Sequence, residues 1–205
     1  MAPILPRDFY LHPPDAVARQ LLGKLLVRRY RTEQGASAKT VRLAGRIVEV
    51  EAYFGLDDPA AHAFAGMTAR NAVLFGPPGF AYVYFIYGMH FCLNISCEPE
   101  GHAGSLLLRA LEPVEGLETM AQLRGLPSDA APRLLTSGPG RLCQALGIRR
   151  ETHNGTDVTS ARSGLHVEDD GFVAGKIEAT PRVGISKAAE RPLRFSLAGN
   201  RFVSR

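Results

Sequence analysis

The chain has 205 residues, 45% of them hydrophobic, so it is long enough for one globular domain with a buried core. It contains no run of 18 apolar residues, which argues against a membrane span. The first residues lack a basic region followed by an apolar run, and the three cysteines form no CxxC pair. We therefore expect a cytoplasmic protein without a secretory signal. The net charge is +4, and only four of the 24 basic residues are Lys, which fits a polyanionic partner, although a GC-rich genome would produce the same bias.

The first half of the chain predicts one helix and two strands. Apolar spacing predicts a helix over 9–29 that runs into a strand at 24–30. The polar segment 31–39 contains Gly and predicts a turn, and alternation predicts a second strand over 41–53. A loop with a short helix is expected over 55–67.

The second half continues the same mixture of strands and helices. A hairpin is expected over 80–96, a buried strand over 105–111, and helices over 113–124 and 137–146. Short strands with turns follow. We expect a single α+β domain over the whole chain, with a curved, largely antiparallel sheet and a protruding β-hairpin.

Two acids and an aromatic residue alternate along the strand expected over 41–53. Alternation places Glu49, Glu51 and Tyr53 on one face, so a carboxylate and a phenol ring are neighbours. A carboxylate beside a ring in a partly dry site is suited to act as a general base for water. Glu51 is the candidate base, but Glu49 fits the pattern equally, and a solvated strand face would need neither role.

His62 follows two adjacent carboxylates, Asp57 and Asp58. Carboxylates with a histidine suggest a metal-dependent hydrolase as one alternative, yet no HExxH or comparable ligand spacing is present. We favour a structural or substrate-contacting histidine, with no metal and no cofactor.

Tyrosines recur along the expected hairpin. Tyr82 and Tyr84 share one strand face, where aromatic side chains commonly pack in the core or across strands. Tyr87 stands beside Gly88 at the turn, where burial is least expected, so it is a candidate wedge that enters a base stack. The alternative is a non-catalytic module whose tyrosines only stack on bases.

The length of the hairpin turn decides whether Tyr84 and Asn94 act together. A two-residue loop places them on opposite faces, whereas a three-residue loop of Tyr87, Gly88 and Met89 places them on the same face. A cavity that both residues line therefore requires the longer loop.

Arg109 lies within an otherwise apolar strand and needs an anionic partner if it is buried. The candidates are Glu51, Glu112 and a phosphate of a ligand. The run SGPGR could hold a phosphate at a helix N-terminus, but it matches no Walker or dinucleotide pattern. Ser137 is more simply explained as a helix cap.

A set of motifs in a fixed order covers most of the chain. They are ARQLLGKLLVRR, GRIVEVEAY, AAHAF, TARN, YVYFIYGMHFCLNIS, LLLRALEP, GLETM, SGPGRLCQALGI, PRVGIS and RPLRF. In this order they resemble the alkyladenine (3-methyladenine) DNA glycosylase family, the type shared by mammals and many bacteria. The resemblance implies a mixed α/β domain with a curved antiparallel sheet. It also implies a monomeric, cofactor-free hydrolase that removes alkylated purines, such as 3-methyladenine and 7-methylguanine, from double-stranded DNA.

The resemblance further implies a role for each candidate residue. Glu51 would activate the attacking water, and Arg109 would lie near that carboxylate and the phosphate of the flipped nucleotide. Tyr53, His62 and Tyr84 would line the base pocket, Asn94 would help to select the base, Tyr87 would fill the gap left by the flipped nucleotide, and Met89 would lie in the same minor-groove hairpin. No Lys lies between Arg46 and Asn94, the segment that holds most of these candidates, which argues against a Schiff-base lyase step.

Two positions depart from the family pattern. His90 replaces an aromatic residue found in some relatives, and the loop at 98–104 is longer than in the mammalian form. These departures affect the rim of the DNA surface and the range of bases, including hypoxanthine, rather than the reaction.

Overall fold

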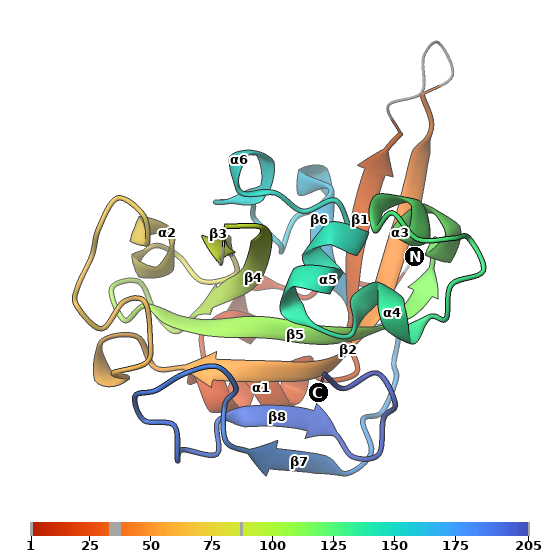
Figure 1. Cartoon of the computed structure of the whole chain (residues 1–205). Coiled ribbons are helices and arrows are strands. Elements are labelled where there is room, and N and C mark those ends of the chain that lie inside the picture. The colour runs from red at the N-terminus through yellow and green to blue at the C-terminus, as the bar shows by residue number, and fades with distance from the viewer. Residues whose placement is uncertain (1, 33–37, 87, 205) are drawn as a thin grey trace.

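An antiparallel sheet forms the centre of the computed structural model, which describes residues 2–32, 38–86 and 88–204 (Figure 1). Within those residues the strands are β1 Leu25–Arg31, β2 Thr40–Tyr53, β3 Ala81–Ile86, β4 His90–Cys97, β5 Gly104–Glu115, β6 Leu165–Glu168, β7 Ile177–Thr180 and β8 Arg194–Leu197. The main path runs β3-β4-β5-β2-β1-β6, and β8 joins β2 to β7. Every strand pairing is antiparallel, as expected.

Short helices cover both sides of this sheet. They are α1 Pro14–Leu21, α2 Ala72–Phe75, α3 Leu117–Leu123, α4 Arg133–Thr136, α5 Pro139–Ala145 and α6 Arg150–His153, with 3-10 turns η1 Arg7–Tyr10, η3 Gly55–Asp57 and η4 Ala161–Ser163. Figure 1 shows α1 on one side of β2 and β5, and α3, α4 and α5 on the other. On α1, Val17, Ala18 and Leu21 are fully buried, which is the spacing of one helical face. The mixed α+β class is therefore confirmed.

β2 changes its partner along one edge, and this bends the sheet. Residues 40–46 pair with β1, whereas Glu49–Glu51 pair with β8. On its other edge β2 pairs with β5, and that ladder has register shifts on both sides of Glu49. Such irregularities bend a strand and redirect its side chains. The two candidate carboxylates thus lie where the sheet curves, and Figure 1 shows β1 turned steeply away from β5.

The register of the β3–β4 hairpin settles the question of the turn. Ile86 pairs with His90, which leaves three residues between the strands. Tyr84 pairs with Cys92, and the next pair on the same face includes Asn94. The three-residue loop is confirmed, and Tyr84 and Asn94 share one face. Tyr87 lies outside the described residues.

Three expected elements have different limits. The first helix is interrupted because two successive prolines, at 13–14, start α1 anew after η1, and Gly23, with φ +88°, ends it before β1. The helix expected at 113–124 begins at Leu117, because β5 continues to Glu115. Ser137 is not a helix cap: α5 begins after Gly138, and within the described part of the chain the buried Ser137 hydroxyl has no hydrogen-bond partner.

Candidate active site

A cavity of about 460 Å³ opens beside the hairpin. It lies against the face of β3, β4 and β5 that also packs a small aromatic cluster, separate from the main core. Its walls come from Tyr53, Ala60, His62, Tyr84, Ile86, Cys92, Asn94, Ser105, Leu107, Arg109, Pro139, Val183, Gly184 and Ile185. All four residues expected to form a base pocket, together with Arg109, line this one cavity.

Aromatic rings form one wall of the cavity. Tyr84 stacks on Tyr82 with ring centroids 5.2 Å apart, and the ring of His62 meets Tyr84 edge-on at 4.5 Å. His62 Nδ1 lies 3.1 Å from the Tyr82 hydroxyl, which holds the imidazole in place. Partial burial, and then the nearby charge of Arg70, lowers the pKa of His62, so the ring stays neutral at pH 7. The wall is therefore aromatic and largely uncharged.

Asn94 supplies the cavity with an unused polar atom. Its amide nitrogen donates to the Ser105 hydroxyl at 3.2 Å, while its Oδ1 is buried and has no hydrogen-bond partner among the described residues. A buried acceptor without a partner costs free energy unless a ligand satisfies it. Asn94 is thus placed to accept a hydrogen bond from a bound molecule.

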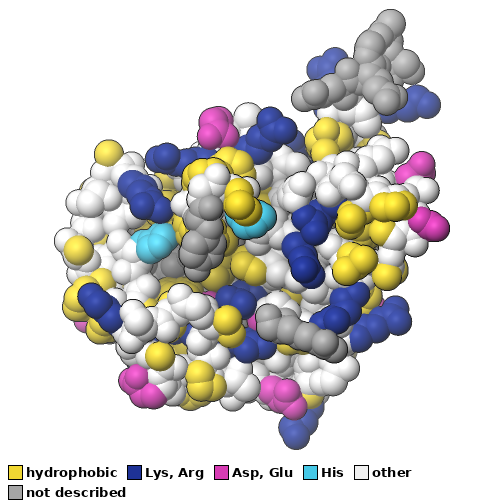
Figure 2. Space-filling view, viewed as in Figure 1, with side chains coloured by type: hydrophobic (Ala, Val, Ile, Leu, Met, Phe, Trp, Pro, Cys, Tyr) yellow, Lys and Arg dark blue, Asp and Glu magenta, His cyan; other side chains and the backbone are white. Residues whose placement is uncertain are grey.

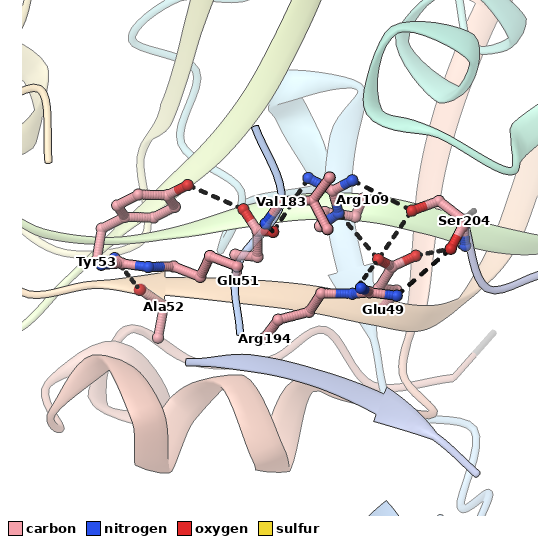
Figure 3. A network of polar contacts seen from close by, with 9 residues as sticks. Glu49, Glu51, Ala52, Tyr53, Arg109, Val183, Arg194 and Ser204 are labelled. Atoms are coloured by element: carbon pink, nitrogen blue, oxygen red, sulfur yellow. Dashed lines mark hydrogen bonds and ion pairs between the residues drawn. The ribbon is translucent and has the colours of Figure 1, made fainter. Parts of the chain in front are cut away.

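Glu51 lies directly behind the cavity wall and is fully buried. The Tyr53 hydroxyl donates to its Oε2 at 2.9 Å, and the Val183 amide donates to its Oε1 at 2.8 Å (Figure 3). Arg109 Nη1 forms an ion pair with the same Oε1 at 3.1 Å. Burial, and then the Glu51 charge, raises the pKa of Tyr53, which remains a neutral donor. Each of these three partners of the carboxylate lines the cavity.

Glu49 occupies a different environment on the same strand. Its carboxylate accepts hydrogen bonds from Arg109 Nε at 2.9 Å, Arg194 Nε at 2.8 Å, and both the amide and hydroxyl of Ser204 at 2.6 and 2.8 Å (Figure 3). Neither carboxylate is itself a lining residue of the cavity, but of the residues that bind Glu49 only Arg109 lines it. Arg109 contacts both carboxylates. Of its expected anionic partners, Glu51 is confirmed, and Glu49 is a second partner. Glu112 instead accepts a hydrogen bond from the Asn200 amide.

Asp58 is committed to a buried ion pair with Arg182. The two terminal nitrogens of Arg182, Nη1 and Nη2, donate to it, and the amides of Phe54 and Ala60 donate to it at 3.3 and 3.1 Å. Burial opposes ionisation, but these hydrogen bonds outweigh it and lower the pKa of Asp58. The Asp58 oxygens are thus occupied by protein donors. The carboxylates next to His62 were the reason to consider a metal-dependent hydrolase on Asp57, Asp58 and His62, and these contacts remove the support that Asp58 gave to it.

Exposed basic side chains lie on the face that holds the cavity. Arg70 lies close enough to affect His62 and Tyr82, and Arg141 follows Pro139 on α5. Both are exposed, as are Arg149 and Arg150. Figure 2 shows Lys and Arg side chains across the middle of this face and acidic side chains mainly at its margin. This distribution suits a polyanion that lies over the cavity.

Comparison with known proteins agrees with this site. The model of the methylpurine-DNA glycosylase family matches residues 8–201. The chain belongs to this family. Its members are DNA glycosylases, so the chain is an enzyme of base-excision repair that hydrolyses the N-glycosyl bond between a base and the DNA sugar.

Relatives match over nearly their whole lengths. A protein of Koribacter versatilis assigned as a 3-methyladenine DNA glycosylase is 57% identical over 98% of this chain and 92% of its own. Similarly assigned proteins of Methanocella arvoryzae and Burkholderia cenocepacia are 50% and 46% identical, over 94% and 98% of this chain and 92% and 91% of theirs. The family resemblance expected from the motifs is therefore confirmed.

The glycosylase places its hairpin residue Met89 away from the cavity. Met89 is 70% exposed and lies at a second groove of about 340 Å³, which Phe91, Leu123 and Arg149 also line. The structure thus does not bring Met89 together with the base-pocket residues.

In the described part of the chain, no helix combines the length and apolar character that a bilayer span needs.

Several residues of the site are not among the candidates that the sequence indicated. Val183, Gly184 and Ile185 form a wall of the cavity, and Ser204 binds Glu49 from the end of the chain. The PRVGIS motif was the only sequence signal for this wall. Ser204 belongs to no motif, so only the fold reveals its contact.

Proposed function

We propose that this glycosylase flips alkylated purines, including 3-methyladenine and 7-methylguanine, out of duplex DNA and hydrolyses the bond that links them to the sugar. The observation behind the proposal is an aromatic cavity with a buried carboxylate, Glu51, immediately behind its wall. A base cannot reach such a cavity while it is stacked in a duplex, so flipping must precede the reaction.

The cavity suits a flat and positively charged base. Purines alkylated at N3 or N7 carry a positive charge, which is attracted to the faces of aromatic rings. Tyr84 offers such a ring, and Tyr53 contributes a second from the end of β2. The unpaired Asn94 oxygen would accept a hydrogen bond from an amino or ring N–H group of the base, and this contact would help to select it.

Glu51 acts in this proposal as the general base. It takes a proton from water as the water oxygen bonds to the anomeric carbon, and the electron pair of the broken bond leaves with the base. An alkylated purine is already a good leaving group, so no acid and no covalent enzyme intermediate is required. Arg109 holds Glu51 in place through their ion pair. The product is an abasic site, and the enzyme has no lyase activity.

The DNA backbone would lie on the basic side chains around the cavity. Arg70, Arg141 and Arg149 are exposed there and can neutralise phosphates. Tyr87 and Met89 would enter the minor groove, and Tyr87 would fill the space that the flipped nucleotide leaves. We propose that the enzyme works as a monomer in the cytoplasm.

Substitution of Glu51 tests the mechanism. We expect Glu51→Gln to slow base release by about 100-fold or more, because general-base catalysis is typically worth about 10²–10⁴-fold. Binding of a duplex with one alkylated purine should persist. Single-turnover assays on oligonucleotides with single defined lesions measure both quantities. A variant within about tenfold of the wild type would refute Glu51 as the base.

Chelation provides the control against metal chemistry. The wild-type rate should be the same with and without EDTA, since the proposed reaction needs only protein groups and water. A large loss of rate in EDTA would contradict the proposal.

A further inference from the structure

Arg182 joins three segments that meet around the proposed base. Its side chain is fully buried and forms two hydrogen bonds with Asp58 in the loop after η3. Nη1 also donates to the carbonyl of Ala52 on β2 at 3.0 Å, and Nη2 to that of Ala188 at 3.4 Å. One residue therefore ties together β2, the loop after it and the segment 181–188.

The same side chain covers one of the cavity tyrosines. The Arg182 guanidinium carbon lies 4.5 Å from the centre of the Tyr53 ring. The Tyr53 hydroxyl in turn donates to Glu51 Oε2. A guanidinium stacked on a ring restricts its rotation, so the contact fixes the direction from which this donor reaches the carboxylate.

The neighbouring residue reaches the other oxygen of Glu51. The Val183 amide donates to Oε1 at 2.8 Å, and Val183 itself is exposed on the cavity side. The exposed Val183 side chain contributes little packing, whereas the preceding Arg182 is buried and anchored by Asp58 and Ala52. The anchor therefore sets the position of the amide that follows it.

We propose that Arg182, clamped by Asp58, is a positioning residue that orients Glu51 for its reaction with water through the Tyr53 ring and the Val183 amide. The inference rests on the proposed role of Glu51. Arg182 does not line the cavity, so it acts through its neighbours and does not touch the substrate. A displacement of about 1 Å in a catalytic group can cost about 100-fold in rate, which makes such a device effective.

A conservative variant, Arg182→Lys, provides the main test. Lys keeps the positive charge beside Asp58 but cannot form the planar, two-armed contact or the same stack on Tyr53. We expect single-turnover excision from an alkylated-purine duplex to fall by about tenfold or more. The dissociation constant for that duplex and the melting temperature should stay close to those of the wild type.

Two further variants complete the design. Arg182→Met leaves Asp58 without its main partner, so its excision rate should be lower than that of Arg182→Lys. The difference between the two variants measures the part of the rate that a positive charge at this position restores. Because Met could also impair folding, Asp58→Asn serves as the second route: it weakens the clamp from the other side and should lower the rate while lesion binding persists.

Arg191→Met is the matched control. Arg191 lies 3.9 Å from the same Asp58 carboxylate but is partly exposed and faces Phe54, 5.3 Å from the ring centre. It makes no contact with Tyr53 or with the 181–183 segment among the interactions of the described residues. Its substitution should leave the excision rate unchanged.

The outcomes separate this inference from the proposed function. Wild-type excision rates in both Arg182→Lys and Asp58→Asn would overturn the positioning role, as would a loss of rate matched by an equal loss of lesion binding. If Glu51→Gln is inactive while those two variants are fully active, the proposed base stands and only Arg182 is refuted. If Glu51→Gln is active, both claims fall.

Discussion

Glu49 and Glu51 lie two positions apart on one strand, yet their carboxylates have different surroundings. Glu49 accepts four hydrogen bonds, two of them from guanidinium groups, and of its partners only Arg109 lines the cavity. Glu51 is held by three groups that all line the cavity. The contacts indicate a structural role for the first carboxylate and favour the second as the base.

Glu49→Gln should therefore affect stability more than chemistry. It leaves Arg109 and Arg194 next to a neutral amide, and breaking a buried ion pair from one side typically costs about 3–5 kcal/mol in the free energy of unfolding. Urea denaturation of Glu49→Gln and Glu51→Gln measures this, and we expect the larger loss for Glu49→Gln. A stable but inactive Glu49→Gln protein would assign the chemistry to Glu49 instead.

His62 provides a pH-dependent property at the scale of one residue. Its pKa is lowered from the ordinary 6.5 by partial burial and by Arg70. Because the unfolded chain binds the proton more readily, the contribution of neutral His62 to stability is present above pH 6.5 and is lost as the pH falls below that value.

An NMR titration of the His62 ring checks this directly. Its pKa should lie below 6.5 in the wild type and should rise in Arg70→Ala, because one nearby positive charge is removed. Arg162→Ala, at an exposed position on η4, is the control. An unchanged pKa in Arg70→Ala would show that Arg70 exerts no electrostatic influence on the cavity.

The hairpin is the element that joins the cavity to the proposed DNA surface. Its register places Tyr84 and Asn94 on the cavity side, while Met89 near the turn is exposed. The loop of three residues that includes Tyr87 follows directly from the pairing of Ile86 with His90. One element can therefore hold the flipped base and contact the duplex from which it came.

Tyr87→Ser should weaken the flipped complex without affecting folding. A wedge compensates the cost of unstacking only in a duplex, and a stacked ring is worth about 1–3 kcal/mol. We expect weaker binding to lesion duplex, little change in binding to the same lesion in a single strand, and an unchanged melting temperature. A variant that melts markedly lower and binds the duplex normally would assign Tyr87 to packing.

At the scale of the whole molecule, the arrangement of charge matters more than its sum. The net charge of +4 is modest, but basic side chains occupy the middle of the face that holds the cavity (Figure 2). Nonspecific attraction to phosphates should therefore be confined to this face and should weaken with salt.

Arg141→Ala should weaken binding to undamaged and lesion DNA alike. Removal of one phosphate contact lowers the salt dependence, so the slope of log K against log salt should decrease by about 1. Lys176→Ala removes the same charge next to β7, which Figure 1 shows at the bottom of the view, away from α5, and should leave the slope unchanged. Equal effects of both substitutions would contradict a localised DNA surface.

The sequence alone determined the antiparallel α+β class and the family, and it indicated five of the residues that line the cavity. Alternation is a local property, so it correctly placed Glu51 and Tyr53 together, and the motifs identified His62, Tyr84, Asn94 and Arg109. The lengths of the early helix and of the helix after β5 were wrong, because prolines at 13–14 and the continued pairing of β5 override local apolar spacing.

Only the tertiary structure decided which carboxylate is held entirely by residues that line the cavity. Glu49 and Glu51 are equivalent by spacing, and they differ because Ser204, Arg194 and Val183 reach them from segments more than 130 residues away in the chain. The loop length of the hairpin and the Asp58–Arg182 ion pair are likewise long-range or register effects. Contacts of this kind depend on how strands pair and bend, which no local pattern specifies.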